Sequence, residues 1–130
     1  MATQTDKLPS QEKLLIDYVR RLEKLKEGRG LAHVHLSQLR PFNRREQHIR
    51  TAAGNFDSLI KDMHGQLFTT KNADLFFFFK SQVKSQVETV VQKIRFLFGD
   101  DPLVEDDGKD GREFTTWYDT AAQYDEVVQL

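Results

Sequence analysis

The segment GQLFTTKNADLFFFFK, residues 65–80, decides the fold of this chain. Two runs rich in β-forming residues, 66–70 and 74–80, flank the tripeptide Lys71-Asn72-Ala73, and asparagine tolerates the positive φ of a tight turn. The pattern therefore predicts a β-hairpin. Four consecutive phenylalanines, residues 76–79, place large apolar side chains on both faces of the second strand. We therefore expect this strand to lie in the middle of a sheet that is covered on both faces.

The segments on either side predict the rest of the sheet and its helices. Residues 30–39 alternate as a strand, with one apolar face (Ala32, Val34, Leu36) and one mixed face (Leu31, His33, His35, Ser37). Apolar residues at helical spacing predict helices over residues 10–26, 43–64, 81–98 and 114–130.

Local signals set the expected ends of these helices. Ser10 is the expected N-cap of the first helix. Asn43 followed by Glu46 predicts a capping box, and Gly65 the C-cap of the same helix. Thr116 and Asp119 are read as a capping pair in the last helix, although residues 113–118 also fit a strand.

This order of elements predicts an α+β fold, a ferredoxin-like sandwich with its first and third strands at the centre. Both core helices cover one face of the sheet, and the terminal helices or a partner cover the other. The expected organisation is a disordered tail (1–9), an N-terminal helix (10–28), the core (30–103), an acidic loop (104–112) and a C-terminal helix (113–130) that leads to a possible downstream domain.

Composition narrows the class of protein. A chain of 130 residues is long enough for one domain with a real core, and a net charge of −1 gives no electrostatic basis for nucleic-acid binding. The chain has no cysteine, and its polar first residues do not form a signal peptide. We therefore expect a cytoplasmic protein with no membrane partner. The last residues, EVVQL, lie in an amphipathic pattern without a stop signal, which is typical of a fragment.

At the hairpin turn, Asn72-Ala73-Asp74-Leu75-Phe76 resembles, in degenerate form, the Gly-Gly-Asp-Glu-Phe motif of the GGDEF domain, the palm-like module that makes cyclic di-GMP. The resemblance covers roughly residues 30–102 and keeps the acidic residue and the aromatic residue of the motif. It implies a GGDEF-like sandwich in a bacterial signalling protein of the cyclic di-GMP pathway, placed upstream of an EAL-type domain or inside a multidomain regulator.

The departures from the motif bear on chemistry. Side chains at Asn72 and Ala73 obstruct the close backbone approach to a nucleotide that the family's glycines allow. Leu75 stands where the family has its catalytic glutamate. The family's metal-binding aspartate is expected on the first strand, which offers only His33, His35 and Ser37. We therefore expect no cyclase activity, no catalytic residue, no cofactor and no metal. The expected role is that of a regulatory or dimerisation domain, with nucleotide binding left open.

We expect the binding partner to be another protein or a second copy of the chain. Candidate interface residues are the apolar ones on the hairpin strand and the terminal helices: Phe76, Phe78, Leu15, Tyr18, Leu22, Trp117 and Tyr118. Arg40, Arg44 and Arg45 form a basic cluster at a predicted helix start, where they fit either an anion site or a solvated face paired with the acidic loop.

Two further interpretations are weighed against simpler ones. His33 and His35, two residues apart on one strand, fit a transition-metal site, but without a carboxylate nearby in sequence we favour a half-exposed strand face. An aromatic strand beside them also fits an RRM-like nucleic-acid-binding module, whose basic-glycine-aromatic signature is absent. His48 and His64 are read as surface residues.

Overall fold

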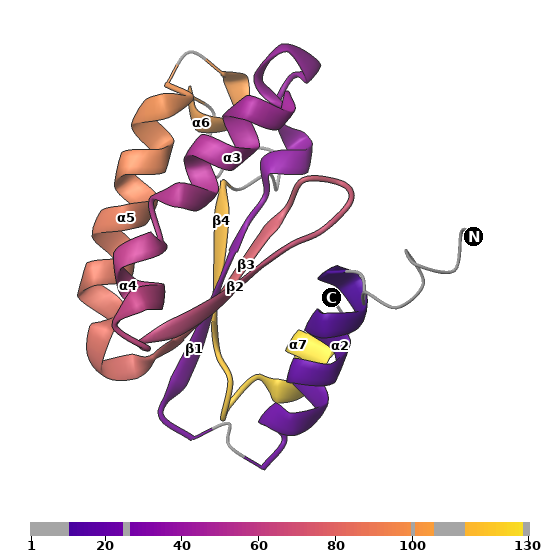
Figure 1. Cartoon of the computed structure of the whole chain (residues 1–130), viewed down its shortest axis with the longest axis vertical. Helices are drawn as coiled ribbons and strands as arrows, with labels where there is room; N and C mark the ends of the chain where they lie inside the picture. Colours follow the sequence, from indigo (N-terminus) through magenta and orange to yellow (C-terminus); the bar gives the residue numbers. More distant parts are fainter. Residues whose placement is uncertain (1–10, 25–26, 100, 106–113, 129–130) are drawn as a thin grey trace.

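The computed structural model of the chain describes residues 11–24, 27–99, 101–105 and 114–128, which form an α+β fold around one antiparallel sheet (Figure 1). Its strands are β1 (Arg29–Val34), β2 (Gly65–Thr69), β3 (Leu75–Lys80) and β4 (Thr115–Asp119). The order across the sheet is β2-β3-β1-β4, and every neighbouring pair is antiparallel. The predicted hairpin is confirmed, and so is the central position of the first and third strands.

Helices cover both faces of this sheet (Figure 1). One face carries α3 (Glu46–Gly54), α4 (Asp57–Lys61), α5 (Lys84–Leu97) and α6 (Pro102–Glu105). The other face carries α2 (Gln11–Leu22) and α7 (Tyr124–Val128), which come from opposite ends of the chain. Short 3-10 turns, η1 (Leu36–Gln38), η2 (Pro41–Asn43) and η3 (Ser81–Val83), join these elements. Among the described residues, no helix has the length and apolar character that a bilayer crossing requires.

The phenylalanines of β3 divide between two separate cores. Phe77 and Phe79 pack into the core beneath α3, α4 and α5, where the ring of Phe77 stacks on Phe56 with 4.4 Å between centroids. Phe76 and Phe78 pack into the second core beneath α2 and α7, where Tyr18 lies 4.7 Å from Phe78 between centroids. Because none of the four is more than 7% exposed, the strand is buried on both faces, as the run of phenylalanines predicts.

The predicted helix over residues 43–64 is broken in the structure. Its expected capping box is wrong, because Asn43 belongs to η2 and donates its side-chain amide to Asp101 Oδ2 at 2.9 Å, while α3 begins at Glu46. The expected C-cap at Gly65 is also wrong, because this residue begins β2. A Cβ at Gly65 would lie 2.5 Å from the carbonyl oxygen of Phe78, so close packing of the hairpin is what requires glycine there.

The preferred helix over residues 114–130 is wrong for its first part, where the alternative strand is observed. Residues 115–119 form β4, which pairs with β1 and places Trp117 opposite Ala32. The capping pair is therefore absent: Asp119 ends the strand, and its Oδ1 accepts a hydrogen bond from the backbone N–H of Ala121 at 3.0 Å. The predicted tail (1–9), the Ser10 cap and most of the acidic loop lie outside the described residues, and the loop's first two residues belong to α6.

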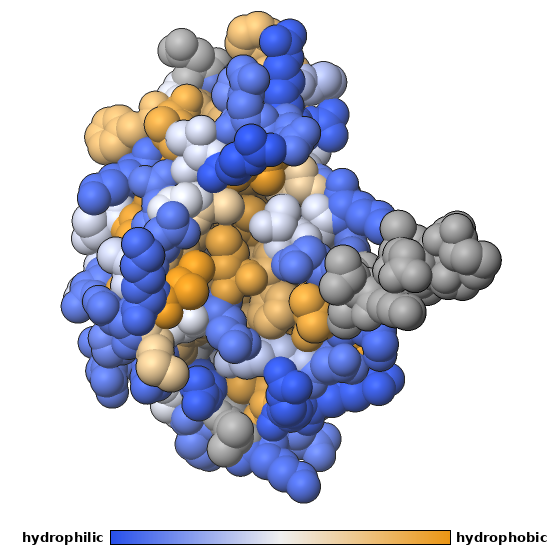
Figure 2. All heavy atoms as spheres, viewed as in Figure 1, coloured by the Kyte–Doolittle hydropathy of each residue, from blue (hydrophilic) through white to orange (hydrophobic). Residues whose placement is uncertain are grey.

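Charged and polar side chains dominate the outer surfaces of the helices, but apolar side chains gather in a hollow between α4 and α2 (Figure 2). A cleft in this region is lined by Leu14, Ile60 and Leu67 among others. Leu14 and Ile60 are each 37% exposed.

Candidate functional site

The turn end of the hairpin carries a buried polar pair. Asp74 lies directly before β3 and is 6% exposed, and His33 lies on the neighbouring strand β1 and is 7% exposed. The Nε2 atom of His33 is 2.7 Å from Oδ2 of Asp74. The other carboxylate oxygen, Oδ1, accepts a hydrogen bond of 2.8 Å from the backbone N–H of Ser37. Both oxygens of Asp74 are therefore engaged within the fold.

His35 completes a cluster with this pair. Its ring centroid lies 4.0 Å from that of His33, and its Nε2 is 2.7 Å from Oγ1 of Thr116 on β4. The candidate ligand atoms of His33, His35 and Asp74 all lie within 4.8 Å of one another. The ring of Phe76 stacks on His33 at 4.1 Å between centroids and forms an apolar wall beside the cluster.

The sequence placed the two histidines on one strand face but did not connect them to the carboxylate. Asp74 is 41 residues from His33 along the chain. The antiparallel register of β1 and β3 pairs His33 with Phe76, so the residue just before β3 lands beside the histidines. The order of elements predicts that the first and third strands are neighbours at the centre of the sheet, and this pairing could have suggested the contact.

The electrostatics of the cluster favour a charged carboxylate. Burial raises the pKa of Asp74, but the hydrogen bonds from His33 and Ser37 outweigh it, so the pKa lies below its ordinary value of 3.8. On the other side of the pair, Nδ1 of His33 is buried and has no hydrogen-bond partner among the described residues. A buried polar atom without a partner costs free energy, so this nitrogen requires an explanation.

The turn itself offers little reactive chemistry. Ala73, and not Asn72, takes the left-handed conformation, with φ at 78°. Leu75 is fully buried in the core beneath α5 and offers neither a ligand nor a proton acceptor. Of the five residues that resemble the GGDEF motif, Asp74 is the one with an ionisable side chain.

The basic cluster lies at the other side of the same end of the sheet, around η2. The side chains of Arg40, Arg44 and Arg45 are exposed, and the guanidinium of Arg45 lies 5.2 Å from the centroid of the Phe42 ring. Asp101, three residues before the acidic loop (104–112), meets this segment: its Oδ2 accepts a hydrogen bond from the backbone N–H of Arg40 at 3.0 Å. This contact uses a backbone amide of the basic cluster and not a guanidinium.

The candidate interface residues lie largely inside the chain. Phe76, Phe78 and Leu22 are at most 7% exposed, and Leu15, Tyr18 and Tyr118 pack partly buried against the same core. Trp117 packs against the other core, with its ring edge-on to Phe79. Because α2 and α7 cover the sheet from within the chain, this face is not an open contact surface. The aromatic stacking platform of an RRM-like module is likewise covered.

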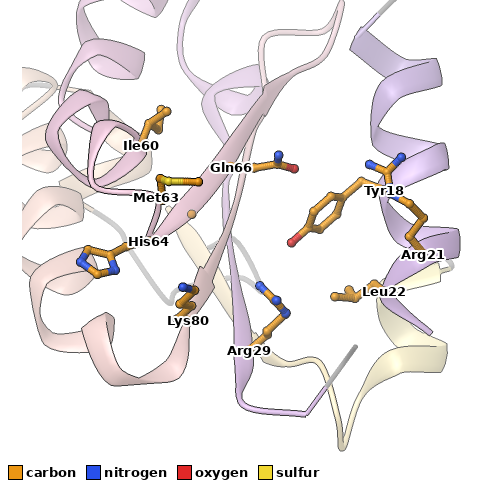
Figure 3. Close-up of a pocket in the computed structure, with 10 residues that line it drawn as sticks. Tyr18, Arg21, Leu22, Arg29, Ile60, Met63, His64, Gln66 and Lys80 are labelled. Carbon is orange, nitrogen blue, oxygen red and sulfur yellow. The ribbon is translucent and has the colours of Figure 1, made fainter. Parts of the chain in front are cut away.

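A cationic cleft of about 420 Å³ lies at the opposite end of the sheet (Figure 3). Arg21 comes from α2, Arg29 and Lys80 face each other across β1 and β3, and His64 precedes β2. Arg29 and Lys80 carry like charges at directly paired strand positions and repel each other. Together with Arg21 they give the cleft a positive potential that suits anions. Its residues come from four distant segments, so the sequence showed no local pattern for it.

The structure thus offers two chemically distinct places: a buried histidine–carboxylate cluster at the turn end of the sheet and an open cationic cleft at the other end. The first has donor atoms for a metal ion, and the second has charge for an anionic group. Comparison of the chain with models of protein families, with curated proteins and with solved structures finds no match.

Proposed function

We propose that the chain is a non-catalytic regulatory domain, a degenerate GGDEF-like module of the ferredoxin-like type, which acts in the cytoplasm through protein–protein contact. The strand order β2-β3-β1-β4 supports this, because it is the order of a ferredoxin-like sandwich. The helices that connect β1 to β2 and β3 to β4 lie on one face, as that fold requires. Ala73 adds support, because its left-handed backbone occupies the place of the motif's second glycine.

The non-catalytic role rests on how Asp74 is hydrogen-bonded and on the burial of Leu75. Phosphoryl transfer with magnesium requires clustered oxygen ligands that face the nucleotide. Here the Asp74 carboxylate is held by His33 and Ser37, and Leu75 is fully buried where the motif has its glutamate. The test is incubation of the purified chain with GTP and magnesium. We expect no cyclic dinucleotide, and its formation would overturn this part of the proposal.

The contact surface that we propose is the outer side of the terminal helices. Ile16 on α2 is 52% exposed and Val128 on α7 is 47% exposed. Both border an apolar groove of about 270 Å³ that reaches down to Phe76 and Phe78 on the sheet. In a two-fold homodimer, the protruding apolar side chains of each copy can fill the apolar groove of the other copy, so this surface is complementary to itself.

Light scattering on the purified chain tests this interface. We expect a dimer in the wild type and a monomer in Ile16→Glu, because a charge in a closed apolar interface is strongly unfavourable. Phe96→Glu is the matched control: Phe96 is 83% exposed on α5, across the sheet from α2, so its replacement leaves the dimer intact. A wild-type chain that stays monomeric at all concentrations would refute the homodimer.

A further inference from the structure

We propose that His33, His35 and Asp74 bind a divalent transition-metal ion, with zinc as the best fit. The site is independent of the proposed regulatory function, since it rests on side-chain geometry alone. His33 lies on β1, His35 follows the last residue of β1, and Asp74 directly precedes β3; β1 and β3 are the two central strands of the sheet and are paired from Arg29 with Lys80 to Val34 with Leu75.

The spacing of the donors is close to that of a zinc site. Zinc lies about 2.0–2.2 Å from imidazole nitrogen and carboxylate oxygen, so its ligand atoms stand roughly 3–4 Å apart. The candidate atoms here lie within 4.8 Å of one another, and one pair, His33 Nε2 and Asp74 Oδ2, is 2.7 Å apart. Small rotations of these side chains therefore bring all three donors to bonding distance while the strands stay in place.

A second observation points to a missing ligand at the same place. His33 is 7% exposed, and its Nδ1 is buried without a hydrogen-bond partner among the described residues. Hydrogen bonding as it stands therefore satisfies one side of this buried ring and leaves the other unsatisfied. An ion that His33 coordinates through Nδ1 supplies this missing partner, whereas an ion coordinated through Nε2 takes the place of the hydrogen bond to Asp74.

The surroundings resemble those that orient metal ligands elsewhere. The backbone N–H of Ser37 donates to Oδ1 of Asp74, which leaves Oδ2 on the side of the histidines. Thr116 Oγ1 lies 2.7 Å from Nε2 of His35 and fixes that ring, and the Phe76 ring packs against His33. Such outer contacts set ring orientation and raise affinity.

The donor set also selects the kind of metal. Two imidazoles and one carboxylate suit zinc, and more generally the later first-row divalent ions, whereas magnesium and calcium prefer an all-oxygen set. With three protein ligands, the fourth position of a tetrahedral ion remains for water. The site therefore differs in its donors from the oxygen site that two-metal phosphoryl transfer requires.

Calorimetric titration of the tag-free chain with Zn²⁺, and the visible absorption spectrum of the Co²⁺ form, test the site. We expect one ion per chain and a Co²⁺ spectrum of tetrahedral type. His35→Gln should weaken Zn²⁺ binding at least about tenfold, because it removes a direct ligand. The matched control is His48→Gln, which changes a histidine beside Phe42 and Phe98, away from the cluster, and leaves binding unchanged.

The buried ligands need a control for folding. Asp74→Asn keeps the shape of the side chain and removes its charge, and its circular dichroism and melting temperature without metal show whether the fold is retained. A folded Asp74→Asn chain with weakened Zn²⁺ binding supports the site. Failure of the wild type to bind Zn²⁺, wild-type affinity in His35→Gln, or wild-type affinity in a folded Asp74→Asn would each overturn the proposal.

Discussion

The Nε2 atom of His33 lies 2.7 Å from Oδ2 of Asp74, inside the fold, and joins the central strand β1 to the residue that precedes β3. The pair closes the turn end of the sheet and also holds two of the three donors of the proposed metal site. Its contribution to stability and its contribution to metal binding are separable, because the first is measured on the metal-free chain.

Asp74→Asn should lower the free energy of unfolding at about pH 6 by about 1–3 kcal/mol, because it weakens charge-assisted hydrogen bonds to a buried group. The pKa of Asp74 in the folded chain is below its ordinary value of 3.8. The ionised carboxylate therefore contributes stability that is present above this unfolded-state value and is lost as the pH falls through the folded-state pKa. Urea unfolding at about pH 6 and about pH 3 should show a larger loss for the wild type than for the variant. Equal losses would contradict this assignment.

Asp101→Ala should destabilise the chain by about 2–3 kcal/mol, because it leaves buried donors without their acceptor. Asp101 is 2% exposed and accepts hydrogen bonds from the backbone of Arg40, the amide of Asn43 and the backbone of Leu103. Urea denaturation measures the change. Asp57→Ala, an exposed carboxylate on α4, is the control and should alter stability by less than about 0.5 kcal/mol. Similar values for both variants would show that Asp101 does not anchor η2.

Ala73→Gly should stabilise the chain by about 0.5–1 kcal/mol, since glycine adopts a positive φ without the cost that a Cβ imposes. The φ of Ala73 is 78° in the hairpin turn. Thermal unfolding of the two chains gives the difference. Ala122→Gly, in the turn after β4 at a residue without positive φ, should be neutral or destabilising. A lower melting temperature for Ala73→Gly would contradict the turn conformation.

Phe78→Glu should unfold the chain or reduce its stability by more than about 3 kcal/mol, because it buries a charge and removes a large apolar side chain. Phe78 is 1% exposed and contacts the rings of Tyr18 and Phe68. Phe96→Glu, at a residue 83% exposed, is the matched control and should melt near the wild type. An unchanged melting temperature for Phe78→Glu would show that α2 does not cover this side of β3.

The sequence predicted the elements whose signals are local and strong. The run of phenylalanines identified β3, the alternation from Leu31 to Val34 identified the faces of β1, and the spacing of valines identified α5. The predicted strand over residues 30–39 is wrong beyond Val34, because Leu36–Gln38 form the 3-10 turn η1. Sequence signals failed where a side chain had a tertiary role that outweighed its local preference. Asn43 resembled a helix cap but bonds to Asp101, and Gly65 resembled a helix stop but allows close packing of the hairpin. The helical spacing of Trp117 and Tyr118 hid a strand that pairs with β1.

The candidate site was half visible for a related reason. The alternation of residues predicts that His33 and His35 lie on the same side of the chain, but Asp74 comes close to them only through the pairing of β1 with β3. The cationic cleft was not visible, because Arg21, Arg29, His64 and Lys80 are spread over four segments of the chain. A site whose residues come from distant segments can be predicted from the sequence only when the pairing of the strands is known.

The arrangement of α2 and α7 on one face of the sheet has a consequence for motion. The sheet separates the core beneath these helices from the core beneath α3, α4 and α5, and Tyr124 ties the two helices together by donating to the carbonyl of Val19 at 2.9 Å. A local opening can therefore detach α2 and α7 as one cooperative unit while the larger core stays folded. A ligand that binds to α2 or to α7 would therefore change the protection of the other helix against amide hydrogen exchange.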